Sequence, residues 1–201
     1  MKDAITEQPL NMLAICGSLR EKSFSAALVR ELPGLAPGWV TIVESSSIGN
    51  VPHYDGDLEV ASGVPSGAMQ LGQMISDADS VVIVSPEYNT SIPGVLKNAI
   101  DWVSRVPGGP FANKPVLIAS ASPGPFGGVR MHQHLRQVLS GVGAYTYPRP
   151  DIAVGLAGQR FDEEGRLIDD AMRELIRKQL ADFAVFTRKL IRELDDEDDR
   201  R

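Results

Sequence analysis

The sequence predicts an α/β protein built on a doubly wound parallel sheet with helices on both of its faces. Five short apolar stretches alternate with five segments of helical periodicity along 201 residues, a length typical of one domain. The stretch Val81–Val84 is β-branched and apolar on both faces, as expected of a strand in the middle of a parallel sheet. Because right-handed crossovers place each helix on a face of the sheet, we expect a three-layer αβα arrangement.

The first half of the chain supplies two strands and two helices. We expect the strands over 11–16 and 39–44 and the helices over 25–32 and 66–78. Ala27, Leu28 and Leu32 share one face of the first helix, which gives this helix an apolar side to pack on the sheet. Gly and Pro mark the residues 53–65, where we expect an irregular connection.

The second half continues the alternation. We expect strands over 80–85, 114–120 and 144–154 and helices over 93–105, 128–140 and 169–194. Ser91 and Pro93 provide a hydroxyl cap and an early proline, both common where a helix begins. The last helix keeps a 3.6-residue apolar period from Met172 to Ile191.

Five strands favour the flavodoxin-like order 2-1-3-4-5 over the six-stranded dinucleotide-binding order. The domain then covers 11–194, with an N-terminal extension over 1–10 and an acidic tail over 195–201 that we expect to be disordered. In this order strands 1 and 3 diverge, and ligands bind outside the carboxyl ends of the strands at that point. We therefore expect the loops after strands 1, 3 and 4 to meet at one site.

Charge and composition argue against several classes of function. A net charge of −6 without a basic stripe disfavours nucleic-acid binding. No apolar run approaches the ~20 residues of a membrane span, and no signal-peptide pattern is present. The one cysteine, Cys16, fits an inert core thiol and a cytoplasmic location. No Cys or His cluster has the spacing of a metal site, and we expect His132 and His134 on the surface or in loops.

The loop after the first strand combines hydroxyl groups and a guanidinium just before a helix. Ser18, Ser23 and Ser25 carry the hydroxyls and Arg20 carries the charge. With the free N–H groups of a helix N-terminus, they predict an anion site. The alternative is that Ser23 only caps the helix and Arg20 lies in solvent. The absence of a P-loop and of a Gly-x-Gly-x-x-Gly motif disfavours triphosphate hydrolysis and a Rossmann dinucleotide site.

Two further loops suit a flat heterocyclic ring. After the third strand come Pro86, Glu87, Tyr88, Asn89 and Thr90. Backbone amides there are able to bond the polar edge of a ring while the tyrosine covers it. The glycine-rich loop 120–128 after the fourth strand allows close approach of the backbone to a ligand. Each loop alone also fits an ordinary turn, so the case for a ligand rests on their convergence.

Three segments carry specific motifs in a fixed order and spacing from about Met12 to beyond Val138. They are GSLREKSFSAAL, SPEYNTSIPGVLKNAIDWVSR and KPVLIASASPGPFGGVRMHQHLRQVL. In these segments the chain resembles the NADPH-dependent FMN reductase family, in particular its chromate and quinone reductase branch. The resemblance implies that Ser18, Arg20 and Ser23 hold the FMN phosphate. It also implies that 86–89 line the isoalloxazine ring and 122–127 close its far side.

The resemblance, read with the loops, gives a set of expected site residues. The cofactor-binding residues are expected to be Ser18, Arg20, Ser23, Phe24, Ser25, Pro86, Glu87, Tyr88, Asn89, Thr90, Ser122, Pro123, Gly124 and Gly127. The family often has Asn where this chain has Ser25, and a hydroxyl still donates to phosphate. No side chain is expected to act as a strict acid or base, and no metal is expected, while Tyr88 and Asn89 shape the acceptor face.

The expected reaction is hydride transfer from NADPH or NADH to FMN and then to a quinone, chromate, azo or nitroaromatic acceptor. No second nucleotide module is visible, so both substrates are expected to use one crevice by a ping-pong route. A flavodoxin-type electron carrier and a flavin-bound regulatory protein remain the alternatives. A carrier's phosphate loop normally alternates Thr and Gly, unlike GSLREKS.

The helix over 93–105 carries an apolar arc wider than one core contact needs. Its members are Val95, Leu96, Ala99, Ile100, Trp102, Val103 and Val106. A deeply buried helix would explain the arc, but we favour a homodimer or tetramer formed through the helices 93–105 and 128–140, which the family resemblance also implies.

Overall fold

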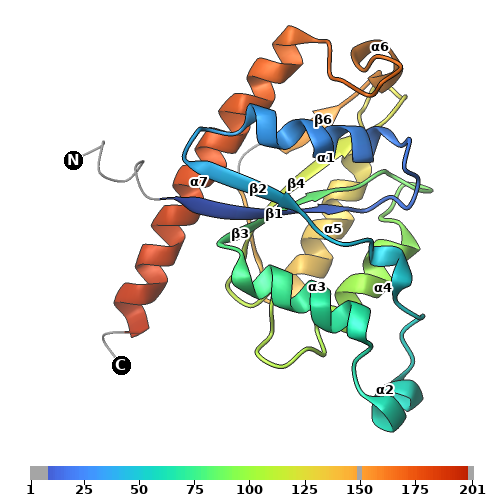
Figure 1. Ribbon diagram of the computed structural model, residues 1–201, viewed down its shortest axis with the longest axis vertical. Helices are drawn as coiled ribbons and strands as arrows, with labels where there is room; N and C mark the ends of the chain where they lie inside the picture. Colours follow the sequence, from blue (N-terminus) through green and yellow to red (C-terminus); the bar gives the residue numbers. More distant parts are fainter. Residues whose placement is uncertain (1–8, 149–150, 199–201) are drawn as a thin grey trace.

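The fold is a twisted parallel sheet between two layers of helices, and the computed structural model describes residues 9–148 and 151–198 (Figure 1). Within these residues the strands run in the order β2-β1-β3-β4-β5, and β6 also pairs with β4. Their bounds are β1 Leu10–Cys16, β2 Val40–Glu44, β3 Ser80–Val84, β4 Pro115–Ala121, β5 Tyr145–Thr146 and β6 Ile152–Val154. Every pairing between these strands is parallel, and their order confirms the predicted sheet order.

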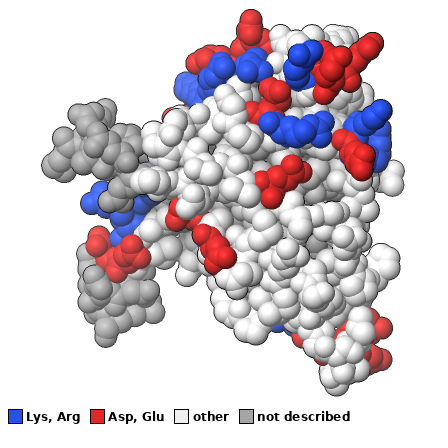
Figure 2. Space-filling model, in the orientation of Figure 1, with Lys and Arg blue, Asp and Glu red and all other residues white. Residues whose placement is uncertain are grey.

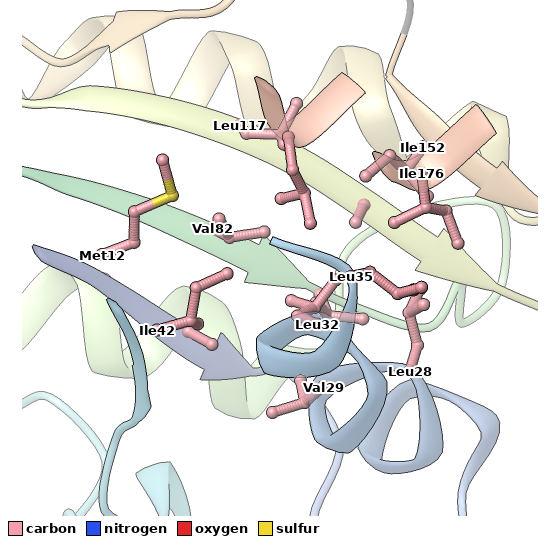
Figure 3. Packing of buried hydrophobic residues seen from close by; sticks show 14 of the residues in the cluster. Met12, Leu28, Val29, Leu32, Leu35, Ile42, Val82, Leu117, Ile152 and Ile176 are labelled. Atoms are coloured by element: carbon pink, nitrogen blue, oxygen red, sulfur yellow. The ribbon is translucent and has the colours of Figure 1, made fainter. Parts of the chain in front are cut away.

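The helices divide between the two faces of the sheet. Their bounds are α1 Phe24–Leu35, α2 Gly56–Ser62, α3 Ser66–Asp77, α4 Gly94–Val103, α5 Val129–Gly141, α6 Ala157–Arg160 and α7 Asp170–Asp198, with a short 3₁₀ turn at Ile48–Asn50. Helices α1 and α7 share one core with alternate strand residues such as Met12 and Leu117 (Figure 3). Helices α3, α4 and α5 share the other core with the intervening residues such as Leu13 and Ile118. This period of two is what a sheet buried on both faces requires.

The fifth predicted strand is two strands. The sequence predicts one strand over 144–154, but β5 pairs with β4 at Pro115 and Val116 and β6 pairs with it from Ala119 onward, so the described pairing is in two pieces. Prolines at 148 and 150 cannot donate to a strand ladder, which accounts for the interruption. Both pieces still lie beside β4.

Helices α2 and α6, the 3₁₀ turn at Ile48–Asn50 and the end of α7 are helical where the sequence predicts no helix. Helix α2 begins after Asp55, whose carboxylate accepts a hydrogen bond from the N–H of Asp57 at 2.9 Å. Helix α7 continues to Asp198, so the acidic residues 195–198 are helical rather than part of a disordered tail. Residues 199–201 of that predicted tail, and most of the predicted N-terminal extension, lie outside the described residues.

The wide apolar arc of α4 is covered within the monomer. Trp102 is fully buried, and its Nε1 donates to the Pro52 carbonyl at 2.8 Å. The ring of Tyr54 meets the indole edge-on at 5.0 Å between centroids. The segment 52–54 thus occupies the side of α4 for which we expected a second subunit, and the arc by itself no longer argues for a dimer.

Charged side chains of both signs share the surface. On the face in Figure 2, Lys and Arg lie next to Asp and Glu toward the end of the molecule that holds α6. Among the described residues, no helix is both long enough and apolar enough to cross a bilayer.

Candidate functional site

The loops after β1, β3 and β4 leave the sheet side by side. Cys16 is in register with Val84, and Val84 with Ala119, so the three strands end at nearly the same level. The Gly17 N–H donates to the Val84 carbonyl at 2.8 Å. A Cβ on Gly17 would lie 2.6 Å from Ser85 Oγ, so only glycine lets the first loop approach β3 this closely. The three loops therefore begin next to one another, as predicted.

The first loop forms a polar corner at the N-terminus of α1. Ser23 caps the helix, because its Oγ accepts a hydrogen bond from the Ala26 N–H at 3.0 Å. This contact confirms the capping role but leaves the Ser23 hydroxyl proton available. The Ser25 Oγ is buried and has no hydrogen-bond partner among residues 9–148 and 151–198. An orphaned buried hydroxyl beside the positive end of a helix needs an acceptor, and an anion supplies one.

Arg20 extends from this corner into solvent. Its backbone N–H donates to Ser18 Oγ at 3.3 Å, and no carboxylate in the described part of the chain forms an ion pair with its guanidinium. A guanidinium without an ion pair, five residues before an orphaned hydroxyl on the same loop, fits an anionic ligand. Burial raises the pKa of Cys16, just before the loop, and keeps that thiol protonated as expected of a core residue.

Phe24 belongs to the protein core rather than to the polar corner. Its ring lies 5.7 Å from that of Phe161, centroid to centroid. Phe24 is the first residue of α1, so its backbone N–H has no intrahelical acceptor and can bond a ligand. Of the predicted residues, Phe24 can therefore serve an anion only through its backbone.

The loop after β3 folds into a strained turn. Tyr88 and Ser91 exchange two backbone hydrogen bonds of 3.0 Å each, which closes a four-residue turn. Asn89 and Thr90 both have positive φ angles, 50° and 65°, without a glycine. For a β-branched residue such as Thr90 this conformation is costly, and such strain gathers at functional sites.

Glu87 ties this loop to α5. Its carboxylate accepts a hydrogen bond from the Arg130 N–H at 3.1 Å and pairs with the Arg130 guanidinium at 2.5 Å. The Glu87 side chain is only 8% exposed, whereas that of Arg130 is 63% exposed. The Glu87 carboxylate therefore caps the N-terminus of α5 and holds the loop after β3 against this helix.

A cleft of about 340 Å³ opens between the second and third loops. It is lined by Glu87, Asn89, Thr90, Ser122, Gly124, Pro125, Phe126, Gly127, Gly128 and Arg130. Pro125 and Phe126 lie within the segment 122–127 that was predicted to close the ring site, whereas Gly128 and Arg130 lie just beyond it. Tyr88 is 46% exposed and, like Pro86 and Pro123, is not part of the lining.

The loop 122–128 is clamped against the end of β6. The Ser122 N–H donates to the Val154 carbonyl, and the Leu156 N–H donates to the Gly124 carbonyl, each at 3.0 Å. Gly127 has a φ of 64°, and a Cβ there would lie 2.9 Å from backbone atoms of Ala153 and Gly155. The loop is therefore a rigid wall of the cleft.

His132 is buried, which contradicts the predicted surface role. It is 4% exposed, with its Nε2 2.6 Å from Ser120 Oγ and its Nδ1 3.0 Å from Asp151 Oδ2. The missed signal was its spacing to Leu135 and Leu139, which places the imidazole on the core face of α5. His134 is on the surface as predicted and contacts the Ser91 hydroxyl.

A model of the NADPH-dependent FMN reductase family matches residues 10–159. The chain belongs to this family. It is 40% identical over 184 residues to a quinone reductase of Escherichia coli K12, covering 91% of this chain and 98% of the relative. It is 41% identical over 181 residues to an NAD(P)H-dependent FMN reductase of Pseudomonas aeruginosa, covering 90% and 97%.

A solved structure agrees with these relatives. The flavoenzyme FerB of Paracoccus denitrificans, an NAD(P)H:(acceptor) oxidoreductase, superposes with a TM-score of 0.79 at 29% identity, covering 90% of this chain and 98% of FerB. This member of the FMN reductase family is therefore an oxidoreductase that depends on FMN and NAD(P)H, as the sequence motifs implied. The orphaned Ser25 hydroxyl and the unpaired Arg20 fit the phosphate of that cofactor.

Proposed function

We propose that FMN binds with its phosphate at the N-terminus of α1 and its ring in the cleft between the loops after β3 and β4. The orphaned Ser25 hydroxyl carries this proposal, because it lies in the first turn of α1 where a phosphate would complete its bonding. Ser18, Arg20 and Ser23 surround the same place on one short loop. Residues 86–90 and 122–127 form the two sides of the ring site.

Within this site the protein positions the reactants, and bound FMN supplies the hydride-accepting and electron-donating chemistry. Backbone N–H groups along the cleft stabilise negative charge at a ring edge. Tyr88 and Asn89 shape the face on which donor and acceptor stack. No lining side chain is placed as an obligatory acid or base, so the residues act by position and electrostatics.

We propose a quinone as the acceptor, with NAD(P)H and the quinone using the cleft in turn. The quinone reductase relatives support this substrate class, and chromate, azo dyes and nitroaromatics are further candidates for the same open face. One cleft used in turn gives ping-pong kinetics. Double-reciprocal plots of rate against NADPH at several quinone concentrations are expected to be parallel, whereas intersecting lines would contradict a shared cleft.

The choice between NADPH and NADH depends on the cations near the cleft. Arg105 is engaged elsewhere, 5.2 Å from the Tyr54 ring centroid and 3.8 Å from Glu59. Arg130 stands at the rim of the cleft and is mostly exposed despite its contact with Glu87. We propose Arg130 as the contact for a 2′-phosphate, tested by comparing KM for NADPH and NADH in Arg130→Gln.

The absorbance of the purified protein, followed by titration with NADPH and NADH, tests the proposal as a whole. A yellow protein that bleaches with a nicotinamide nucleotide and regains its colour with quinone is expected. Arg20→Ala is expected to raise the FMN Kd about tenfold, because a charge-assisted contact contributes ~1.5 kcal/mol or more. A protein that stays colourless in excess FMN would sink the proposal, as would an Arg20→Ala variant with unchanged affinity.

The same titration separates the alternatives. An electron carrier or a flavin-bound regulatory protein would hold FMN without oxidising NAD(P)H in the presence of a soluble quinone. Steady consumption of NADPH with quinone excludes both.

We further propose a cytoplasmic homodimer or tetramer formed through α4 and α5. The exposed apolar side chains Tyr88, Phe126 and Val129, at the mouth of the cleft and the start of α5, support an interface there. A reaction that consumes a reduced nicotinamide nucleotide supports the location. Gel filtration that returns a monomer at dilute concentration would contradict the oligomer, and fractionation of cells would test the location.

A further inference from the structure

A buried chain of hydrogen bonds runs from the wall of the cleft into the core. The Ser120 hydroxyl donates to the Gly127 carbonyl at 2.6 Å, and Ser120 Oγ lies 2.6 Å from His132 Nε2. On the other side of the ring, Asp151 Oδ2 lies 3.0 Å from Nδ1. Arg136 Nη2 donates to Asp151 Oδ1 at 2.5 Å, which completes the chain.

The order Ser–His–Asp is that of a hydrolytic triad, but its geometry excludes a nucleophile. Ser120 is fully buried, and its hydroxyl proton is directed to a carbonyl of its own protein. A nucleophile needs a free path to its substrate and a base that takes its proton. The hydrogen bonds from Ser120 to Arg136 therefore serve to hold the Gly127 carbonyl in place.

The contacts determine where the protons lie. A carbonyl oxygen can only accept, so the single Ser120 proton serves Gly127, and Ser120 Oγ must then accept from Nε2–H. Asp151 accepts from Arg136 at Oδ1 and, at Oδ2, lies within hydrogen-bond distance of Nδ1. With these partners, all four contacts form together only when both ring nitrogens of His132 act as donors.

A neutral ring would break one contact of the chain. If only Nδ1 is protonated and donates to Asp151, Nε2 becomes an acceptor. The Ser120 hydroxyl then donates to Nε2, and the Gly127 carbonyl loses its donor. The other charged pair at this loop, Glu87 and Arg130, bonds the N-terminus of α5 and does not reach that carbonyl.

The Gly127 carbonyl sets the orientation of the next N–H. In a trans peptide the C=O and the following N–H point in opposite directions. Anchoring the carbonyl on Ser120 turns the Gly128 N–H away from the core. Gly127 and Gly128 both line the cleft and have φ angles of 64° and 90°, and no residue in the described ranges accepts from the Gly128 N–H.

We propose that His132 is a positioning residue for FMN, which holds the Gly127–Gly128 peptide through Ser120 so that the Gly128 N–H faces the ring site. This inference rests on the proposed flavin site. Only the doubly protonated ring fills this role. Deprotonation frees the Gly127 carbonyl, loosens the peptide and weakens the binding of FMN.

The test is FMN binding to the apoprotein, followed by flavin fluorescence between about pH 5 and 8, where a histidine changes its charge. The variants are His132→Gln, Ser120→Ala and, as a matched control on the same helix, His134→Gln. Loss of one hydrogen bond raises the FMN Kd of the first two about threefold to tenfold at low pH. The ratio of the variant Kd to the wild-type Kd is expected to shrink as pH rises. Because the FMN phosphate titrates equally in both proteins, its effect cancels in this ratio. His134→Gln behaves as wild type.

A second measurement keeps the inference testable if a variant fails to fold. In ¹⁵N-histidine spectra of the wild-type holoprotein, assigned by the signal missing in His132→Gln or by contact with Ser120, both nitrogens of His132 are expected to bear protons. At the low end of this range, about pH 5, a ring nitrogen with a lone pair while FMN is bound would overturn the inference.

The two failures can be told apart. If Ser25→Ala weakens FMN binding but His132→Gln and Ser120→Ala bind as wild type at every pH, the site stands and the positioning role is wrong. If Ser25→Ala and Arg20→Ala leave FMN binding unchanged, the proposed site itself is wrong, whatever the protonation of His132.

Discussion

Ser25 carries a hydroxyl that forms no hydrogen bond within the described part of the protein. Its Oγ is buried in the first turn of α1 without a hydrogen-bond partner among the described residues. A buried hydroxyl without a partner costs free energy on folding, and the cost is recovered only when a ligand accepts its proton. The residue therefore has opposite effects on folding and on binding, which makes the two separable.

Replacing Ser25 by alanine is expected to weaken FMN binding without harming the apoprotein. The FMN Kd should rise about twofold to tenfold for the loss of one hydrogen bond, while the free energy of unfolding of the apoprotein stays equal or rises by up to ~1 kcal/mol. Flavin fluorescence and denaturant unfolding measure the two quantities. Ser80→Ala is the matched control, since Ser80 Oγ is also buried and unpartnered but lies at the start of β3, away from the cleft. An equal effect of both variants on FMN binding would contradict the role of Ser25.

Thr90 gives a second test at the scale of one residue. Its φ of 65° disfavours a β-branched side chain by roughly 1–2 kcal/mol, and glycine adopts this angle freely. After the greater chain entropy of glycine is subtracted, Thr90→Gly should raise the free energy of unfolding by about 0.5–1 kcal/mol. Thr90→Ala keeps the Cβ and removes the same hydroxyl, so it should give no such gain. Equal stability of the two variants in denaturant would show that the turn is not strained.

At the scale of secondary structure, the sequence predicts what periodicity and caps determine and misses what neighbouring segments decide. The strands β1 to β4 and the helices α1, α3, α4 and α5 appear within a few residues of their predicted bounds, since each has its own apolar pattern. Helix α7 passes its predicted end because no breaker follows Leu194, although acidic residues disfavour a helix C-terminus. Helix α2 is short and has no buried residue, so its sequence lacks the apolar periodicity from which a helix is predicted.

The site shows the same division. The three loops and their hydroxyls were predicted because motifs at strand ends are local features of the sequence. The bonds from His132 to Ser120 and Asp151 join residues from α5, β4 and the segment before β6, and no local pattern encodes them. Likewise, the wide apolar arc of α4 predicted a partner surface, and only the fold shows that Tyr54 and Pro52 cover it.

The junction of β1 with the first loop provides a prediction for an element boundary. A methyl group at position 17 would lie 2.6 Å from Ser85 Oγ and 3.0 Å from Ser85 Cα, so the first loop or β3 must shift. Gly17→Ala should lower the free energy of unfolding by about 1–3 kcal/mol and weaken FMN binding, because it separates two of the three loops. Gly34→Ala is the control, since nothing lies within 4 Å of a Cβ in that position of α1. Gly34→Ala should raise the free energy of unfolding by up to ~1 kcal/mol and leave FMN affinity unchanged. If Gly17→Ala also left FMN affinity unchanged, the close contact between the first loop and β3 would not matter for the site.

At the scale of the whole molecule, the proposed FMN site joins parts of the chain that are far apart in sequence. The residues 17–25, 86–90 and 122–128 follow three different strands and come together only when the sheet is assembled in the order β2-β1-β3-β4-β5. An unfolded chain therefore has no flavin site. Because FMN binds only the folded state, its binding free energy adds to the stability of the entire domain.

This coupling predicts a large thermal shift. FMN at 100 times its Kd stabilises the fold by ~2.7 kcal/mol, which for a domain of this size raises Tm by about 5–10 °C. In Ser25→Ala the apoprotein should melt at or slightly above the wild-type temperature, yet the same FMN concentration should raise its Tm by less. Calorimetry over a series of FMN concentrations measures both. If the variant and the wild type show equal shifts at every concentration, the phosphate does not contact the N-terminus of α1, because a weaker complex must stabilise less at fixed ligand concentration.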